Sequence, residues 1–184
     1  MKMIIAVTFL GILAHAFAEE CELMPGAEEF DSDKYFNISV AYVTHSRSGN
    51  GEDVCRKYQT TNNGNGTSVT VVSADYKNGD GNAQTEVKCI NKPKNGNNGQ
   101  FIVECEVPQG TGITETVQVE TSVIATDNQN YALLQRCTKT ASDIEDDILV
   151  LQTNKDSVDE GVTKVFGINN WNINEWKSRN SVGC

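Results

Sequence analysis

Residues 83–108 read AQTEVKCINKPKNGNNGQFIVECEVP, and this stretch decides the fold. Two runs in which apolar and polar residues alternate flank a segment rich in asparagine and glycine, which is the pattern of an antiparallel hairpin. A disulfide between Cys89 and Cys105 centres the hairpin on that turn. Because side chains alternate across a strand, Phe101 and Val103 then share the face of the disulfide, whereas Glu104 and Glu106 face the other way. We expect the apolar face to point inward.

The same alternation continues on both sides of this hairpin. Runs of period two are separated by short clusters of Gly, Asn, Asp or Ser, which are typical turn residues. Eight runs are expected to form strands: Ser39–Ser46, Asp53–Thr61, Thr67–Lys77, Ala83–Asn91, Gln100–Pro108, Glu115–Thr126, Gln129–Thr138 and Asp147–Asn154. Such short turns join consecutive antiparallel strands, whereas parallel strands would need helical crossovers. The sequence therefore predicts an all-β fold, an eight-stranded antiparallel up-and-down barrel.

One helix is expected after the last strand, where the hydrophobic period changes. Ser157 and Glu160 have the spacing of a capping box. Four apolar residues share one helical face: Val158, Val162, Val165 and Phe166. Trp171 and Trp176 follow, and we expect these large aromatic side chains to pack the C-terminal tail onto the barrel wall.

The N-terminal residues predict export. Residues 1–18 contain an early lysine, an apolar stretch and small residues before Glu19, which together are typical of a cleaved signal peptide and too short for a membrane anchor. The mature chain, residues 19–184, has the size of a single domain. The net charge of −10 argues against nucleic acid and anionic membrane surfaces as partners. We expect a secreted monomer.

Six cysteines lie in the mature chain, and an even number in an exported protein predicts three disulfides. Once Cys89 and Cys105 are paired, the other four leave three connectivities open. One of these ties both ends of the chain to the outside of strands: Cys21–Cys137 and Cys55–Cys184. No pair has the Cys-x-x-Cys spacing of a structural zinc site, and His45 is the only histidine of the mature chain. We therefore expect no metal.

That connectivity would give the barrel interior two cations. If Cys55 and Cys137 face outward, alternation turns Arg56 and Arg136 inward. An eight-stranded barrel can enclose one small ligand, and an arginine can pair with a carboxylate on it. The alternative for Arg56 is an ion pair within the protein.

The last strand supplies another candidate contact. Its residues Ile148, Val150 and Gln152 share one face, so Gln152 could orient an otherwise hydrophobic ligand; the alternative is that it lies at the rim in water. The complete set of predicted ligand contacts is Arg56, Gln152, Arg136 and Tyr42.

Catalysis is not expected from this sequence. His45 and Ser46 are adjacent on a strand and so point to opposite faces, and no Gly-x-Ser-x-Gly turn presents a nucleophile. Two N-glycosylation sequons, at Asn37 and Asn65, fit a surface exposed outside the cell.

Several segments carry a family resemblance: Glu20–Pro25 (ECELMP), Asp33–Phe36 (DKYF), Tyr42–His45 (YVTH), Tyr131–Cys137 (YALLQRC) and Ile148–Thr153 (ILVLQT). They resemble the salivary lipocalins of blood-feeding triatomine bugs, the triabin and procalin family. The resemblance covers essentially the whole chain and implies a lipocalin barrel. Haem-carrying relatives have a histidine on a barrel strand, and the corresponding residues 69–76 contain none, so no haem cofactor is expected.

The resemblance also implies a function. Its nearest group contains inhibitors of collagen-induced platelet aggregation that are thought to sequester thromboxane A2 in the barrel. Others in the group inhibit the kallikrein–kinin system by binding contact-phase proteins through an outer surface. We therefore expect a salivary anti-haemostatic protein that captures a small lipid mediator. The alternative is a surface-acting inhibitor of the contact system or of a clotting protease, with host plasma proteins as partners.

Overall fold

The computed structural model describes residues 20–49, 54–78, 81–94, 96, 98–109, 112–139 and 144–179. The predicted signal peptide, residues 1–18, lies outside the described residues, and so does Cys184. The domain boundary at residue 19 and the Cys55–Cys184 bridge therefore stay predictions.

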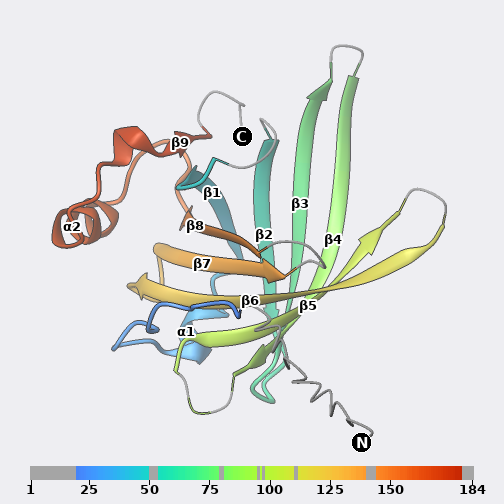
Figure 1. Ribbon diagram of the computed structural model, residues 1–184, viewed down its shortest axis with the longest axis horizontal. Helices are drawn as coiled ribbons and strands as arrows, with labels where there is room; N and C mark the ends of the chain where they lie inside the picture. The colour runs from blue at the N-terminus through green and yellow to red at the C-terminus, as the bar shows by residue number, and fades with distance from the viewer. Residues whose placement is uncertain are drawn as a thin grey trace, which may run out of the picture.

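Eight antiparallel strands close into a barrel (Figure 1). They are β1 (Val40–Ser46), β2 (Val54–Asn62), β3 (Ser68–Asn78), β4 (Gly81–Pro93), β5 (Gln100–Pro108), β6 (Thr114–Thr126), β7 (Tyr131–Lys139) and β8 (Ile144–Gln152). Each strand pairs with the next, and β1 pairs with both β2 and β8, which closes the sheet. A two-residue strand, β9 (Lys177–Ser178), also pairs with β1. The predicted up-and-down barrel is confirmed, and three residue pairs between β1 and β2 close it.

The hairpin of residues 83–108 has the predicted register. Cys89 lies directly opposite Cys105 in the β4–β5 ladder, and a disulfide joins them. A second disulfide, between Cys21 and Cys137, ties the N-terminal segment to β7. Two of the three predicted pairings are therefore present, and the described part of the chain holds no free cysteine.

The segment that precedes β1 closes one end of the barrel. It contains a short helix that the sequence did not predict, α1 (Ser32–Tyr35), which begins where Asp31 accepts the N–H of Lys34 at 3.1 Å. Phe30 and Phe36 flank this helix, and their ring centroids lie 5.7 Å and 5.1 Å from that of Phe101 on β5. This aromatic cluster packs at the end of the barrel next to α1.

The C-terminal helix packs on the outside of the barrel (Figure 1). Helix α2 (Glu160–Ile168) begins after Asp159, whose carboxylate accepts the N–H of Gly161 at 2.7 Å. The predicted start at Ser157 is therefore wrong by two residues, because Asp159 is the side chain that reaches the free N–H groups of the first turn.

Helix α2 and the tail cover the outer faces of β7 and β8. Val162 and Phe166 are buried there together with Trp176, while Val158 is exposed. The predicted apolar face is thus correct except for Val158, which precedes the helix. The short turn η1 (Ile173–Glu175) leads from this cluster into β9. The barrel therefore has two cores, one inside it and one beneath α2.

Candidate functional site

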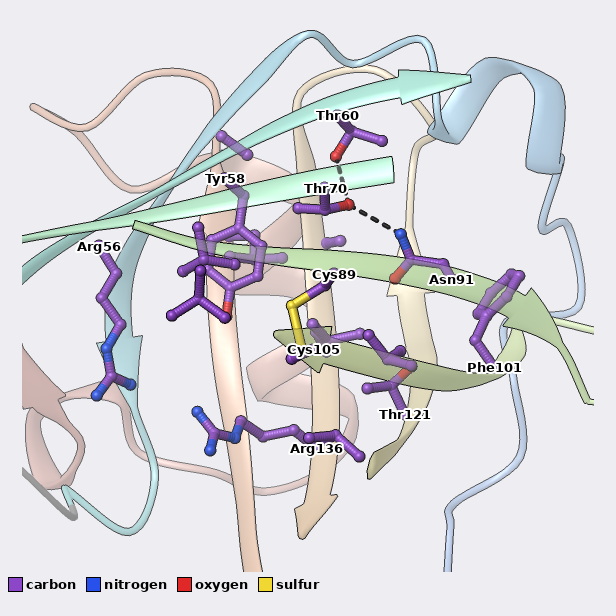
Figure 2. Close-up of a pocket in the computed structure, with 18 of the residues that line it drawn as sticks. Arg56, Tyr58, Thr60, Thr70, Cys89, Asn91, Phe101, Cys105, Thr121 and Arg136 are labelled. Carbon is purple, nitrogen blue, oxygen red and sulfur yellow. Dashed lines mark hydrogen bonds between the residues drawn. A yellow bond between two sulfur atoms is a disulfide. The ribbon is translucent and has the colours of Figure 1, made fainter. Parts of the chain in front are cut away.

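The barrel encloses a cavity of about 310 Å³. Alternate residues of β2 to β7 reach it, as the pleat of a closed barrel requires. All eight strands contribute to its lining. The aliphatic part of the wall comes from every strand except β2 and includes Ala41, Val72, Ala74, Val87, Val103, Val107, Val117, Val119, Leu134 and Leu151. The Cys89–Cys105 disulfide also lies in this wall (Figure 2). The cavity has the size and the apolar character of a small-molecule site.

Arg56 of β2 and Arg136 of β7 both line the cavity, where alternation next to Cys55 and Cys137 placed them. Figure 2 shows both guanidinium groups on the same side of the pocket, away from Phe101. Within the described residues, neither group has a carboxylate within ion-pair distance, and no Asp or Glu lines the cavity. The alternative prediction of an ion pair for Arg56 therefore finds no partner in the part of the chain that the structure describes.

Asp147 lies opposite Arg136 in the β7–β8 ladder, but its carboxylate is engaged elsewhere. One oxygen accepts the Ser46 hydroxyl at 2.7 Å, and the other accepts the N–H of Ser48 at 2.9 Å. These bonds hold the carboxylate against the chain that follows β1, so the positive charge of Arg136 stays available to the cavity.

Uncharged polar side chains occupy the other end of the cavity, next to the aromatic cluster. Asn91 donates to the Ser68 hydroxyl at 3.0 Å and to the Thr70 hydroxyl at 2.9 Å. The hydroxyl groups of Thr60 and Thr70 lie 3.0 Å apart. Thr121 lines the same end, directly opposite Phe101 in the β5–β6 ladder. The lumen is therefore cationic at one end, apolar along its wall and neutral but polar at the other end.

Tyrosine side chains add further hydroxyl groups to the lumen. Tyr35 and Tyr58 both line the cavity, and the ring of Tyr58 projects from β2 into it (Figure 2). Burial, together with repulsion from the nearby Tyr58, raises the pKa of Tyr35 far above its usual value. Tyr35 therefore stays protonated at any physiological pH and presents a neutral hydroxyl.

Gln152 does not reach the cavity, which corrects its prediction as a ligand contact. Its side-chain amide donates to the Thr44 hydroxyl at 2.8 Å and accepts the N–H of Asp159 at 2.6 Å. It is only 2% exposed, so the alternative of a rim position in water is also wrong. Gln152 instead connects β1 to the start of α2.

The face of β8 was misassigned for a physical reason. Ile148 and Val150 lie beneath α2 in the outer core, and Leu151 faces the lumen. All five residues from 148 to 152 are buried, because the lumen covers one face of the strand and α2 with the tail covers the other. A strand that is apolar on both faces gives no alternation from which the inward face can be read.

Tyr42 also lies outside the cavity lining. It pairs in register with Gln152, and the ammonium of Lys155 lies 5.9 Å from its ring centroid. It therefore sits with Gln152 on the outer side of the barrel and is not a lumen contact.

His45 is buried in β1 and is not part of the cavity lining. Its Nδ1 lies 3.2 Å from the Thr44 hydroxyl, and burial lowers the pKa of its imidazole. The described residues contain no group of three or more His, Cys, Asp or Glu side chains that could hold a metal ion. No helix in the described part of the chain is long and apolar enough to cross a membrane.

The two sequon asparagines, Asn37 and Asn65, are exposed, which leaves room for the predicted glycans. Asn65 lies in the β2–β3 turn, where its side-chain oxygen accepts the hydroxyl of Thr67 at 2.6 Å. Glycosylation at both positions stays a prediction.

Residues 18–165 match the protein-family model described as triabin. The chain belongs to the triabin family. The resemblance to triatomine salivary lipocalins is confirmed. A relative within this family is pallidipin of Meccus pallidipennis, which is 59% identical and aligns over 100% of this chain and 98% of pallidipin. Platelet inhibitor triplatin-2 of Triatoma infestans is 47% identical, and the alignment covers 100% of both chains.

Solved structures show the same barrel as this triabin-family chain. LTBP1 in complex with leukotriene C4 is 25% identical, with a TM-score of 0.61 over 79% of this chain and 84% of that one. The amine-binding protein of Rhodnius prolixus in its tryptamine complex has a TM-score of 0.73 over 90% of this chain and 88% of that one. It is 20% identical, so this likeness shows the fold alone. The barrel and the family favour a binding protein over an enzyme.

The sequence analysis missed several polar residues of the lumen, and for three of them the sequence carried a usable signal. Tyr58 follows Arg56 by two positions and Asn91 follows Cys89 by two, so each shares the inward face of a residue already assigned there. Thr121 follows the inward Val119 in the same way.

Proposed function

We propose that this triabin-family protein is a secreted salivary inhibitor of host haemostasis that captures a small anionic lipid mediator in its lumen. Thromboxane A2 or a similar eicosanoid is the proposed ligand, and inhibition of platelet aggregation is the proposed result. The observation that carries the proposal is the pair of arginines in the lumen, Arg56 and Arg136. Among the described residues neither has an ion-pair partner, and no Asp or Glu lines the cavity.

The physical case rests on complementary charge and burial. Arg56 and Arg136 are only partly buried, and a carboxylate that binds between the cavity wall and their guanidinium groups gains charge-assisted hydrogen bonds. The hydrocarbon part of a lipid gains about 25 cal/mol for each Å² of apolar surface that the valine-rich wall removes from water. Both features select an amphiphile with one acidic end.

The same charges disfavour amine ligands. A protonated amine needs a carboxylate, and no Asp or Glu lines the described cavity. The leukotriene C4 complex of LTBP1 supports a lipid acid, because that ligand also joins carboxylates to a long hydrocarbon. The name of the relative platelet inhibitor triplatin-2 supports platelets as the target.

The test is calorimetric titration of the oxidised, folded protein with a stable thromboxane A2 mimetic, followed by a platelet aggregation assay. We expect about one mole bound per mole of protein, and loss of both binding and inhibition when Arg56 and Arg136 are replaced together by alanine. The matched control is Arg47→Ala, because Arg47 pairs with Asp146 at 2.7 Å outside the lumen and should not affect either readout.

A folded protein that gives no binding heat, or a double variant that still inhibits platelets, would refute capture in the lumen. In that case the outer surface would be the functional part. The next partners to test would then be the plasma proteins of the contact system.

A further inference from the structure

Thr121 pairs with Arg136 in the β6–β7 ladder, but the guanidinium groups of Arg136 and Arg56 extend away from Thr121 to the other side of the pocket (Figure 2). The chemistry of the end that Thr121 lines differs from that of the arginines. Asn91, Thr121 and Phe101 lie together at this end, opposite the two guanidinium groups in Figure 2. Phe101 and Thr121 face each other across β5 and β6, and Asn91 faces Val103 two residues along. Polar atoms in an apolar wall are costly unless they have partners.

The amide of Asn91 has a fixed orientation. Its nitrogen donates to the hydroxyl groups of Ser68 and Thr70, and it also lies 3.4 Å from the main-chain oxygen of Ser68. A main-chain oxygen can only accept, so the nitrogen and not the oxygen of the amide must face β3. The side-chain oxygen Oδ1 of Asn91 is therefore directed into the lumen, as Figure 2 shows.

Neither of these polar groups is satisfied within the protein. Among the described residues, nothing donates to Asn91 Oδ1, and the hydroxyl of Thr121 has no hydrogen-bond partner. Thr121 is 7% exposed, and its side chain lines the cavity. The pair thus offers one fixed acceptor and one hydroxyl that can donate or accept, which is the complement of an alcohol.

We propose that Asn91 and Thr121 form a hydroxyl-binding subsite for an alcohol group in the tail half of the captured lipid. The ligand O–H donates to Asn91 Oδ1, and the ligand oxygen accepts from the Thr121 hydroxyl. The inference rests on the proposed function, because Arg56 and Arg136 hold the acid end and so direct the tail toward Asn91. The preferred ligand class is then hydroxylated long-chain fatty acids rather than their unsubstituted parents.

The test compares stearate, 12-hydroxystearate and 2-hydroxystearate by calorimetric titration. An apolar pocket disfavours an added hydroxyl, since the hydroxyl must leave water without a new partner. A hydrogen bond reverses this preference by about 1 kcal/mol, so we expect 12-hydroxystearate to bind about threefold to tenfold more tightly than stearate. The 2-hydroxyl lies beside the acid group, and we expect no such gain from it.

Two variants locate the subsite. Asn91→Leu and Thr121→Val should each remove the preference for 12-hydroxystearate over stearate. Thr121→Val is nearly isosteric and breaks no hydrogen bond of the protein, so it remains informative even if loss of the Asn91 bonds to β3 impairs folding. A wild-type protein that prefers stearate, or a preference unchanged in Thr121→Val, would overturn the subsite.

The methyl esters of stearate and 12-hydroxystearate separate this inference from the proposed function. In one outcome, the 12-hydroxystearate ester binds more tightly than the stearate ester only when Thr121 is present, and replacing Arg56 does not weaken binding of the acids. That outcome would support the subsite and refute anion capture. Acid binding that depends on Arg56 but shows no hydroxyl preference would refute the subsite alone.

Discussion

The guanidinium group of Arg47 has a different environment from those of Arg56 and Arg136. Arg47 pairs with Asp146 on the outside, whereas Arg56 and Arg136 face an uncharged lumen. This difference depends on the contacts of single side chains, because all three residues belong to the same barrel. It makes the two lumen arginines the groups whose loss should affect binding most directly.

We predict that Arg56→Ala and Arg136→Ala each weaken binding of an acidic lipid by about 1.5–3 kcal/mol, the usual contribution of a hydrogen bond to a charged group. If both contact one carboxylate, the double variant should lose less than the sum of the two single losses. Calorimetry on wild type, the two single variants and the double variant measures the three losses of binding free energy. Fully additive losses would mean that the arginines bind separate groups.

The buried imidazole of His45 should make the unfolding free energy depend on pH. Burial lowers the pKa of His45 in the folded state, whereas the unfolded chain titrates near 6.5. The unfolded state thus binds the proton more readily, so this histidine reduces stability as pH falls from about 6.5 toward the folded pKa, and has no such effect above about 6.5. Chemical denaturation at pH 7.5 and 5.5 should show a larger loss for wild type than for His45→Gln.

Equal losses in the two proteins would show that other groups account for the pH dependence. Carboxylates such as Asp127 are a poor explanation in this window. Burial acts to raise the pKa of Asp127, but hydrogen bonds from Asn130, Gln129 and Tyr131 outweigh it, so the pKa is lowered and titration occurs at more acidic pH.

At the scale of elements, helix α2 depends on its N-cap. Asp159→Ala removes the acceptor for the Gly161 N–H and should cost about 1 kcal/mol of unfolding free energy, whereas Asp159→Asn should cost much less. Ser157→Ala is the matched control, because Ser157 has the sequence spacing of a cap but does not occupy the cap position. A larger loss in Ser157→Ala than in Asp159→Ala, measured by denaturation, would contradict this assignment.

The placement of α2 explains why elements were easier to predict than their faces. The strands were recognised because turn residues separate runs of period two, and those signals are local. The inward face of β8 was not recognisable, because α2 comes from a later part of the chain to bury Ile148 and Val150 from outside. The same packing removes Gln152 from the site and uses it to hold Asp159.

At the scale of the whole molecule, the two described disulfides constrain the chain very differently. Cys21 and Cys137 are 116 residues apart, whereas Cys89 and Cys105 are 16 apart. In the chain-entropy model such loops correspond to about 4.7 and about 3 kcal/mol. We predict that replacing the Cys21–Cys137 pair by serines lowers the unfolding free energy more than replacing the Cys89–Cys105 pair.

Denaturant titration of both double variants, with fluorescence and circular dichroism as probes, measures the difference. The reverse order would mean that the lumen-lining bridge contributes mainly through packing in the folded state. The stability of the barrel would then depend more on the bridge in the cavity wall than on the bridge to the N-terminal segment.

The barrel and the paired hairpin at Cys89 and Cys105 could be predicted from the sequence alone. The inward direction of Arg56 and Arg136 was predicted from one of three possible disulfide connectivities. Those features follow from alternation and turn chemistry, which act between near neighbours in the chain. Contacts in the folded protein place Gln152 and Tyr42 outside the lumen and direct the amide oxygen of Asn91 into it. These outcomes depend on contacts between residues far apart in sequence: α2 packs over β8, and hydroxyl groups of β3 accept hydrogen bonds from β4. The local pattern of apolar and polar residues does not predict such contacts.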